Sequence, residues 1–419
     1  MPNKTIQVFE HEWLHIGREY GEDRVVFTQE HYTQLSKWIS INSRYEWYTI
    51  FYNKVKFANY VGVIKISDLT IEILPKTDRH PLSKKVWQKT LLDMLVISLQ
   101  VPAQTSTQAH LETKSYNVLE AYIQIFLDEV EALMHAGLVK KYRNTSSNSS
   151  ALKGRLLLQK HLTTNLLHKE RFYVSYQVFD RDNIYNRILH EALHLVKELK
   201  TSMHISAHAD RLLTGFPPCS PLAVNKSLFD KIQFDRKTTN YKKAIELAKM
   251  VLLNYHPDLR GGSNHVFAIM IDMNLLWEVF IARMLVRAAP NFAASVLLQD
   301  SKPYWQHPDG WMLKQQPDII VVKDKKTVVL DTKWKYQNSI SAADVRQMDV
   351  YGNLWTATKR FLVYPDNVQP SVILKSGLFY DVIEDKPTDK NTCGLLLVNL
   401  FDKGEKLNWN IGSDILNEI

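Results

Sequence analysis

The chain has 419 residues, which is enough for two or three domains that each bury a core of their own. Hydrophobic residues make up 45% and charged residues 23%, and this excludes a disordered, collagen-like or low-complexity protein. The two cysteines are too few for a disulfide scaffold or a Cys-rich zinc module, and they suit a reducing cytoplasm. The formal net charge of +8 is compatible with nucleic-acid binding, because basic side chains that contact phosphates release counterions.

Neither the first residues nor the most apolar stretch of the sequence indicates a membrane protein. The first residues lack a basic stretch followed by an apolar one, so we expect no signal peptide. The most apolar long stretch, residues 266–286, is predicted to be a helix and contains four polar side chains: Asp272, Asn274, Glu278 and Arg283. These polar groups argue against a membrane span, and we therefore expect a cytoplasmic protein.

The first 150 residues predict an α+β module. Apolar and polar side chains alternate in short runs up to Pro75, most clearly over residues 61–66 and 69–75, and this period of two is typical of strands. The apolar spacing becomes helical over residues 86–101 and 118–136. We assign residues 1–150 to an N-terminal α+β module.

The middle of the chain reads as a helical region. The stretch 144–150 is low in complexity (Asn-Thr-Ser-Ser-Asn-Ser-Ser), so we expect a loop or linker there. Two segments, residues 184–199 and 241–253, show the spacing of amphipathic helices. We therefore expect a helical connecting region over residues 151–262.

The last part of the chain follows an α/β plan. Gly261 to Asn264 form the clearest boundary, and the expected elements after it are a helix, paired strands, a helix over residues 342–356, and two further strands. We assign residues 263–419 to a C-terminal α/β domain.

The paired strands carry the residues of greatest chemical interest. Two β-branched runs flank a four-residue polar turn, which is typical of a hairpin. If Val322 pairs with Thr327, then Asp318 lies opposite Asp331, and directly opposed Cβ atoms are roughly 4.5–5.5 Å apart. Lys333 lies two residues beyond Asp331 and therefore faces the same side.

This arrangement predicts a metal site for phosphodiester hydrolysis. Two opposed carboxylates repel each other unless a cation lies between them. Oxygen ligands without His or Cys nearby favour Mg²⁺, which activates water and neutralises charge on a phosphate. A neighbouring lysine orients the water or stabilises the transition state. The alternative interpretation is a surface hairpin with charged ends.

Three further residues are candidates for the same site. Gln347 and Tyr351 lie four residues apart on one face of a predicted helix, where they can bind a phosphate or hold the lysine. The alternative is a solvated helix face. Glu278 is a lone acid among apolar residues of a predicted helix, which is typical of a group with a partner, a metal or an altered pKa.

These motifs resemble a known family. Pro317-Asp318, Asp331-Thr332-Lys333 and Gln347 with Tyr351 resemble the PD-(D/E)xK nuclease superfamily, and in particular McrC, the nuclease subunit of McrBC-type modified-cytosine restriction systems. Residues 69–76, 152–156 and 179–189 also resemble segments of that family. The resemblance implies a restriction-endonuclease-like C-terminal domain. It also implies Mg²⁺ held by Asp318 and Asp331 with help from Glu278, and catalysis by Lys333 supported by Gln347 and Tyr351.

The resemblance also implies partners. In that family an McrB-type AAA+ GTPase recognises and translocates modified double-stranded DNA, while McrC stimulates the GTPase through its N-terminal part and cuts through its C-terminal part. The chain has no G-x-x-x-x-G-K-[S/T] phosphate loop, so we expect the GTPase or ATPase motor to be a separate oligomer. Two alternatives remain: a stand-alone nuclease of the DNA-repair type, and a non-catalytic activator of an AAA+ motor.

Two other patterns favour structural interpretations. His190-Glu191-Ala192-Leu193-His194 matches the H-E-x-x-H zinc motif, but we find no convincing third ligand and expect a surface histidine pair. Trp334, next to Lys333, can stack on a base, but an aromatic there more often packs on the other face of a hairpin.

Overall fold

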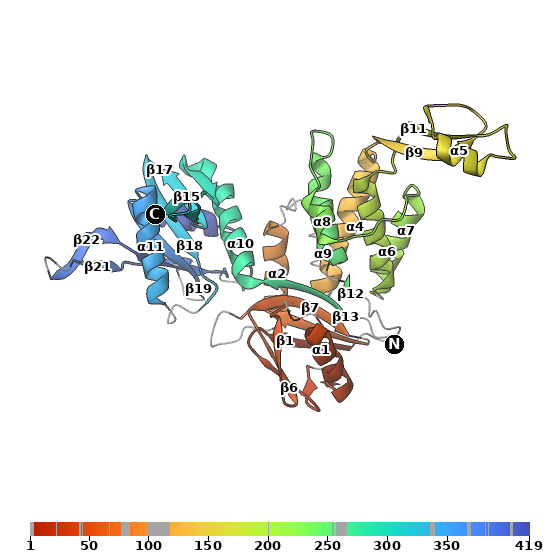
Figure 1. Cartoon of the computed structure of the whole chain (residues 1–419). Helices are drawn as coiled ribbons and strands as arrows, with labels where there is room; N and C mark the ends of the chain where they lie inside the picture. The colour runs from red at the N-terminus through yellow and green to blue at the C-terminus, as the bar shows by residue number, and fades with distance from the viewer. Residues whose placement is uncertain are drawn as a thin grey trace. The chain divides into compact units, whose positions relative to one another are not determined.

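The computed structural model describes residues 4–419 except 22, 42, 44, 67, 77–83, 99–117, 200, 254, 257–265, 336–339, 367–369, 382, 384, 403 and 404. The chain forms two compact units (Figure 1). The first unit comprises Met1–Thr105 and Asp258–Ile419, and the second comprises Ser106–Pro257. The boundary expected at Gly261 to Asn264 lies outside the described residues.

The first unit contains an N-terminal sheet in which strands from both segments of that unit meet. Its strand order is β1-β8-β7-β13, with β1 parallel to β8 and the other pairs antiparallel. Gly62 in β7 has a φ of +135°, and a Cβ atom there would lie 2.0 Å from the carbonyl oxygen of Ile269. Only glycine therefore allows β7 to approach β13 so closely. The bounds are β1 (Lys4–Phe9), β7 (Tyr60–Ile66), β8 (Leu69–Leu74) and β13 (Val266–Asp272).

Shorter elements complete this part of the first unit. The apolar side chains of several of these elements share one core with the sheet, including Leu14, Leu35 and Phe57, whereas α2 packs on α10 and β8. The stacked rings of Trp38 and Trp47 belong to the same core. The elements are β2 (Trp13–His15), β3 (Glu19–Tyr20), β4 (Val25–Val26), α1 (Gln29–Ile41), β5 (Tyr48–Phe51), β6 (Lys54–Phe57) and α2 (Lys84–Ser98).

A second, six-stranded sheet forms the rest of the first unit. Its strand order is β14-β17-β18-β19-β23-β20, and β18, β19 and β23 are parallel neighbours. The pairs β14–β17, β17–β18 and β20–β23 are antiparallel. The bounds are β14 (Ser295–Leu298), β17 (Ile319–Lys323), β18 (Lys326–Thr332), β19 (Lys359–Asp366), β20 (Val372–Lys375) and β23 (Gly394–Asn399).

Helices flank this sheet (Figure 1). Helix α11 packs on β18 and β19, where its residues Met348 and Trp355 share a core with Val329 and Leu362. Helix α10 packs on β14 and β18 and also contacts α2 and α12. The remaining elements are α10 (Met273–Ala288), η2 (Ala289–Phe292), β15 (Lys302–Gln306), β16 (Met312–Gln315), α11 (Ala342–Trp355), β21 (Leu378–Asp381), β22 (Lys386–Thr392) and α12 (Ile411–Glu418).

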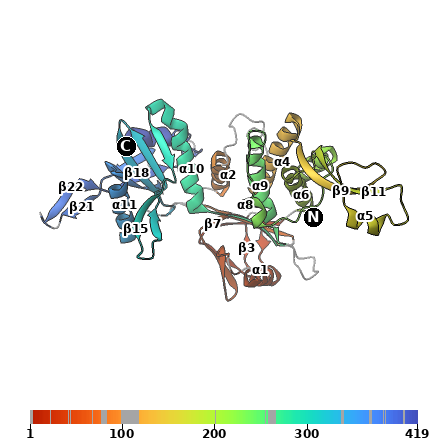
Figure 2. The same cartoon turned by 45° about the horizontal axis from the view of Figure 1, so that its top comes forward.

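The second unit is a helical bundle with a long β-arm (Figure 2). Its helices α4, α6, α7 and α9 pack on one another through buried apolar faces. In the arm, β11 pairs with β9 and with the short β10. The elements are α4 (Val118–Ala136), β9 (Lys141–Ser149), β10 (Arg155–Leu156), α5 (Leu158–Thr164), β11 (Phe172–Asp180), α6 (Ile184–Glu198), α7 (Met203–Gly215), α8 (Lys226–Asp230), η1 (Thr239–Tyr241), α9 (Lys242–Leu253) and β12 (Tyr255–His256).

Two expectations about these elements were wrong. Residues 144–149 belong to strand β9 rather than a linker, because all nine residues of β9 pair with β11 and Arg143 forms an ion pair with Asp180 at 2.9 Å. The apolar stretch that begins at Val266 is a strand up to Asp272 and only then a helix. The side chain of Asp272 accepts a bond from Asn274 N and caps α10, which fixes where the strand ends.

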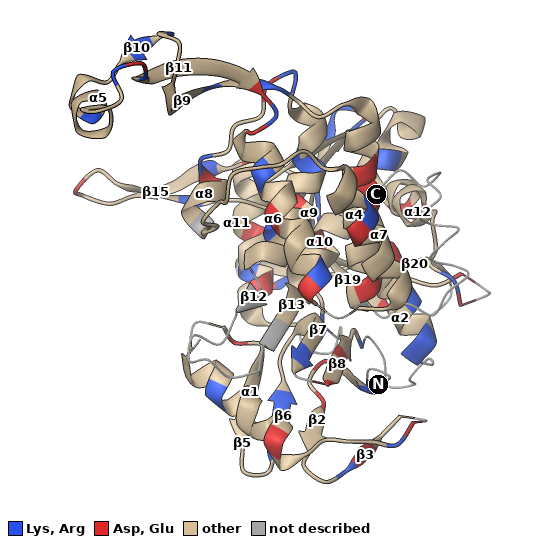
Figure 3. Cartoon of the chain, turned by 90° about the vertical axis from the view of Figure 1, so that its right-hand side faces the viewer, with Lys and Arg blue, Asp and Glu red and all other residues tan. Residues whose placement is uncertain are grey.

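No helix in the described part of the chain is both long and apolar enough to cross a membrane. On the side of the molecule drawn in Figure 3, Lys and Arg are distributed over many elements and alternate with Asp and Glu. The positive net charge is therefore not gathered in one tail.

Candidate active site

The hairpin β17–β18 has the register expected from its sequence. Val322 pairs with Thr327 and Ile319 pairs with Leu330, so Asp318 precedes β17 at the level of Asp331 in β18. The turn is tighter than the expected four residues, because Lys323 and Lys326 also pair. The two residues that remain at the tip, 324 and 325, have φ angles of 50° and 63°, as a type I′ turn requires.

Asp318 is held in place by the strand opposite. Its Oδ2 atom accepts hydrogen bonds from the backbone nitrogen of Thr332 at 2.7 Å and from the Thr332 hydroxyl at 2.8 Å. Asp318 is only half-buried, whereas Pro317 before it is buried. One carboxylate oxygen is therefore fixed by Thr332, and the side chain remains accessible from outside.

Asp331 and Lys333 form an ion pair at the end of β18. The Lys333 Nζ atom lies 2.7 Å from Asp331 Oδ2. Asp331 is 1% exposed, and burial together with the charge of Asp318 raises the pKa of Asp331 to about 6. Burial works to lower the pKa of Lys333, but the charges of Asp331 and Asp318 outweigh it and raise that pKa. Lys333 therefore stays positively charged, while its charge alone does not offset the burial of Asp331 and the repulsion from Asp318.

Glu278 on α10 faces the same group of charges. Burial raises its pKa to about 7, and the negative charges of Asp318 and Asp331 add to the shift. A hydrogen bond with Gln299 and the positive charge of Lys333 act in the opposite direction. The structure therefore brings Glu278 into the electrostatic neighbourhood of all three hairpin residues.

Gln347 and Tyr351 support the start of the hairpin. The Gln347 amide donates to the Tyr351 hydroxyl, and that hydroxyl donates to the carbonyl oxygen of Gln316 at 3.0 Å. Tyr351 is 3% exposed, and burial raises its pKa. Because Gln316 lies two residues before Asp318, this chain of bonds fixes the backbone from which Asp318 projects.

Asp344 and Thr332 belong to the site but were not singled out as site residues from the sequence. Asp344 lies 4.0 Å from Lys333 Nζ and 2.6 Å from Lys335 Nζ, and it forms a capping box with Ser341 at the start of α11. The Ser-x-x-Asp spacing at the start of a predicted helix is typical of a capping box and could have indicated where Asp344 lies. Thr332 is the middle residue of the Asp-x-Lys motif, and no sequence pattern indicated its bond to Asp318.

Trp334 is a structural residue rather than a free stacking platform. It is 7% exposed, its ring meets that of Trp277 edge to face at 5.5 Å, and its Nε1 donates to Glu10 Oε1 at 2.7 Å. Glu10 lies just after β1 and also accepts a bond from the backbone nitrogen of Lys76. The residue after Lys333 is thus anchored on the N-terminal sheet.

The donor set suits a hard divalent cation. Asp318, Asp331 and Glu278 offer carboxylate oxygens, which Mg²⁺ prefers over nitrogen or sulfur ligands. Burial first, and the charge of Asp318 second, raise the pKa values of Asp331 and Glu278, and a bound cation would offset both effects by stabilising the charged carboxylates. These three residues fit Mg²⁺ by chemistry and by charge, and their ligand atoms do not all lie within 4.8 Å of one another in the structure.

The histidine motif on α6 has a structural explanation. The rings of His190 and His194 meet edge to face at 4.5 Å, and His190 also packs near Phe216. Glu191 Oε1 accepts a bond from the backbone nitrogen of Leu222, so it is engaged in holding a loop. Among the described residues, no group of three metal-ligating side chains includes any of these.

We expect the double variant His190→Ala, His194→Ala to bind no less zinc than the unaltered chain and to keep whatever DNA-cutting activity that chain has. The reason is that helical spacing alone accounts for the pair and no third ligand completes a zinc site. Elemental analysis of the purified protein checks this. One tightly bound zinc per chain that is lost in the double variant would contradict it.

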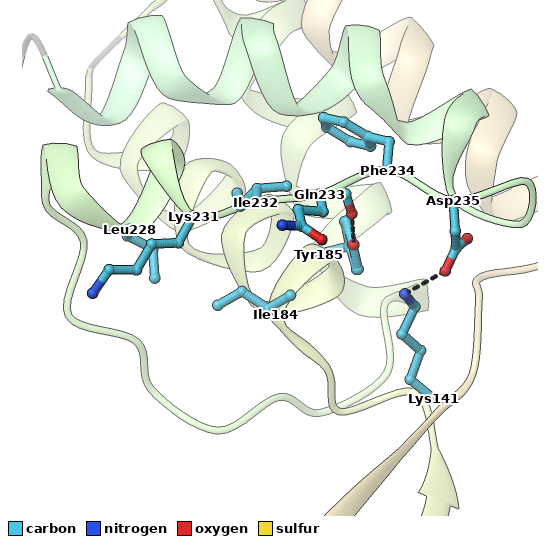
Figure 4. Close-up of a pocket in the computed structure, with 9 residues that line it drawn as sticks. All are labelled: Lys141, Ile184, Tyr185, Leu228, Lys231, Ile232, Gln233, Phe234 and Asp235. Atoms are coloured by element: carbon cyan, nitrogen blue, oxygen red, sulfur yellow. Dashed lines mark hydrogen bonds and ion pairs between the residues drawn. The ribbon is translucent and has the colours of Figure 1, made fainter.

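The second unit contains a cluster of possible metal ligands and a cavity, and several polar side chains of each are bonded to other residues of the same unit. Asp128, Glu131 and His208 place ligand atoms within 4.8 Å of one another, but His208 and Arg211 already pair with Glu131 and Gln124 bonds to Asp128. A cavity of about 430 Å³ lies beside Tyr185 (Figure 4). Tyr185 donates to the carbonyl oxygen of Gln233 there, and an ion pair at 3.0 Å joins two further lining residues, Lys141 and Asp235.

The family model described as "McrBC 5-methylcytosine restriction system component" matches residues 55–365. A relative from Escherichia coli (strain K12), "Type IV methyl-directed restriction enzyme EcoKMcrBC", is 23% identical over 238 residues, which is 55% of this chain and 68% of the relative. A structure of Thermococcus gammatolerans McrB AAA+ hexamers with bound McrC contains a chain of the same fold. Its TM-score is 0.64 at 20% identity, and the match covers 99% of both chains.

The mixed α/β fold and the family match together define a component of a restriction system. The chain belongs to the McrBC 5-methylcytosine restriction system component family, and the resemblance to McrC noted from the sequence is confirmed.

Proposed function

We propose that the chain is the Mg²⁺-dependent DNA endonuclease subunit of a restriction complex driven by an AAA+ NTPase. The observation that supports this most strongly is the meeting of Asp318, Asp331 and Lys333 at one end of a buried hairpin. The C-terminal sheet around it is the part that we assign to a restriction-endonuclease-like PD-(D/E)xK domain, over residues 263–419. Such a protein acts in antiviral defence in the cytoplasm.

Each residue has a role in phosphodiester hydrolysis. A bound Mg²⁺ would supply charge neutralisation on the phosphate and a more acidic water. Asp318 and Asp331 would hold the ion, with Glu278 as a third oxygen donor. Lys333, kept protonated by Asp331, orients the attacking water or stabilises the negative charge that develops on the phosphate. Gln347 and Tyr351 position Asp318 through the Gln316 carbonyl.

The motor is proposed to be an McrB-like AAA+ GTPase or ATPase oligomer. The structurally similar Thermococcus chain comes from an assembly of McrB AAA+ hexamers with bound McrC, and this chain lacks a phosphate loop of its own. We propose that residues 1–150 contribute to motor binding and NTPase stimulation and that residues 151–262 connect them to the nuclease. Double-stranded DNA is the substrate.

The test is Asp318→Asn in a complex reconstituted with the AAA+ partner. We expect DNA cutting to fall by about a thousandfold or more, because losing one metal-binding carboxylate removes several kcal/mol of transition-state stabilisation. Stimulation of the partner's NTPase should persist, because the substitution leaves the rest of the chain unchanged. Plasmid linearisation and phosphate release are measured side by side.

Three outcomes separate this proposal from its alternatives. Near-normal cutting by Asp318→Asn contradicts the assignment of the site. Equal cutting by the unaltered chain with and without the motor favours a stand-alone repair-type nuclease. Motor stimulation without any Mg²⁺-dependent cutting favours a non-catalytic activator.

A further inference from the structure

Strands β15 and β16 form a hairpin outside the six-stranded sheet, immediately before the catalytic motif in sequence. The hairpin projects from the C-terminal sheet, where Figure 2 labels it β15. Its tip closes through bonds between His307 and the backbones of Gly310 and Trp311. Nearly every residue of both strands is exposed, so neither face of the hairpin is covered. A bare two-stranded hairpin is only marginally stable in water, so a covering partner is expected.

The exposed side chains are unusually large and apolar. Trp311 stacks on His307 with ring centres 4.5 Å apart and meets Trp305 edge to face at 5.6 Å. A group of large apolar side chains that stay exposed to solvent is typical of an interaction site. The residues that are between 45% and 53% exposed are Tyr304, Trp305, Trp311, Met312 and Leu313.

The base of the hairpin is fixed to the helix that supports the active site. Lys302 Nζ donates to the carbonyl oxygen of Leu354 at 3.0 Å and lies 5.0 Å from the centre of the Trp355 ring. At the other strand, Tyr351 holds the Gln316 carbonyl. At about 3.3 Å per residue, Trp311 is at most roughly 23 Å of chain from Asp318. The aromatic cluster is thus within one helical turn of DNA from the site.

The charges on the hairpin favour DNA as the occupant. The two lysines of the strands, Lys302 and Lys314, lie at the base of the hairpin, the end from which the chain leads on to Asp318. The single acid, Asp309, lies at the far tip, 3.3 Å from His307. A duplex whose scissile phosphate is at Asp318 must extend past neighbouring elements, and a two-stranded ribbon fits a DNA groove. Proteins that bind in a groove frequently insert apolar side chains between base steps.

We propose that the hairpin β15–β16 enters a groove of the duplex beside the scissile phosphate and places Trp305 and Trp311 against the bases. This role rests on the proposed nuclease function and identifies how that site engages its substrate. It makes the hairpin a determinant of DNA affinity and of the cutting position, whereas the chemistry stays with the residues of β17 and β18.

The first experiment is site-specific photo-crosslinking in the full-length chain with Asp318→Asn, which should not cut, assembled with its AAA+ partner, Mg²⁺ and nucleotide on a duplex. Trp311→benzoylphenylalanine is expected to cross-link to DNA. The matched control is Tyr380→benzoylphenylalanine in hairpin β21–β22, where the side chain is 58% exposed and is expected to give no DNA cross-link. Cross-links from position 311 to a second copy of the chain or to the motor, without DNA, would overturn the proposal.

The second experiment measures cutting by the double variant Trp305→Ala, Trp311→Ala. We expect the DNA concentration for half-maximal cutting to rise about tenfold or more, while the rate at saturating DNA changes little, because base contacts by aromatic side chains contribute to binding. A variant that carries Trp311→Phe in place of Trp311→Ala should regain most of the affinity for DNA. NTPase stimulation should be the same in all of these variants. An unaltered half-maximal concentration would contradict the proposal. Failure of the unaltered chain to cut would count against the nuclease function alone, because the cross-link is measured without cutting.

Discussion

Lys333→Met should reduce DNA cutting by about a hundredfold to a thousandfold, whereas Lys335→Met should leave it nearly unchanged. The two lysines form a matched pair, since both approach Asp344 on α11, at 4.0 Å and 2.6 Å respectively. Only Lys333 also contacts Asp331, at 2.7 Å. If the ammonium group beside Asp331 carries the proposed chemistry, the loss must be specific to Lys333.

The comparison is made in the complex with the AAA+ partner and Mg²⁺, with initial rates of plasmid linearisation for both variants. NTPase stimulation serves as the control for folding and assembly, and it should be equal in the two. Lys333→Arg should recover little activity, because a planar guanidinium does not replace a compact ammonium group. Equal losses for the two methionine variants would show that Asp344 pairing, and not the position beside Asp331, is what matters.

The hairpin and the helix of the site could be predicted from the sequence, because side chains repeat every two residues along a strand and about every four along a helix face. Side chains alternate along a strand, so one correct pair in a hairpin fixes all the others. Placing Val322 opposite Thr327 was therefore enough to bring Asp318 level with Asp331, and the structure confirms this register. The helix over residues 342–355 was similarly accessible from its spacing, and it carries Gln347 and Tyr351. The chemical roles of these residues remain predictions.

Contacts between distant segments could not be predicted in this way. The bond between Trp334 and Glu10 joins residues 324 positions apart, and no local pattern encodes it. The pairing of β13 with β7 likewise depends on which edge of the sheet is free, so residues 266–272 were mistaken for the start of a helix. The side chains of β9 are mostly polar and show no apolar alternation, so its sequence does not indicate a strand. It is a strand because its backbone pairs with β11.

Glu10→Gln should raise the free energy of unfolding at pH 8 by up to about 3 kcal/mol and leave it little changed at pH 4.5. Glu10 is 2% exposed, and burial raises its pKa from 4.5 to about 7. The folded chain therefore binds a proton at Glu10 that the unfolded chain releases between pH 4.5 and 7. Its contribution to stability is complete below pH 4.5 and is lost as the pH rises through 7. A shift of about 2.5 pKa units corresponds to about 3 kcal/mol.

Glutamine keeps an oxygen that can accept the bonds from Lys76 N and Trp334 Nε1, so the substitution removes only the buried charge. Glu12→Gln is the matched control, because Glu12 is two residues away and its side chain is 39% exposed. Urea unfolding of the full chain at pH 4.5 and pH 8 gives the difference for each variant. A Glu10→Gln variant whose stability depends on pH as steeply as that of Glu12→Gln would show that Glu10 is not protonated in the folded chain. If the expected difference is found, the carboxyl group that accepts the bond from Trp334 titrates near pH 7 in the folded chain, and the buried charge that it carries above that pH destabilises the fold even though the bond itself favours the charged form.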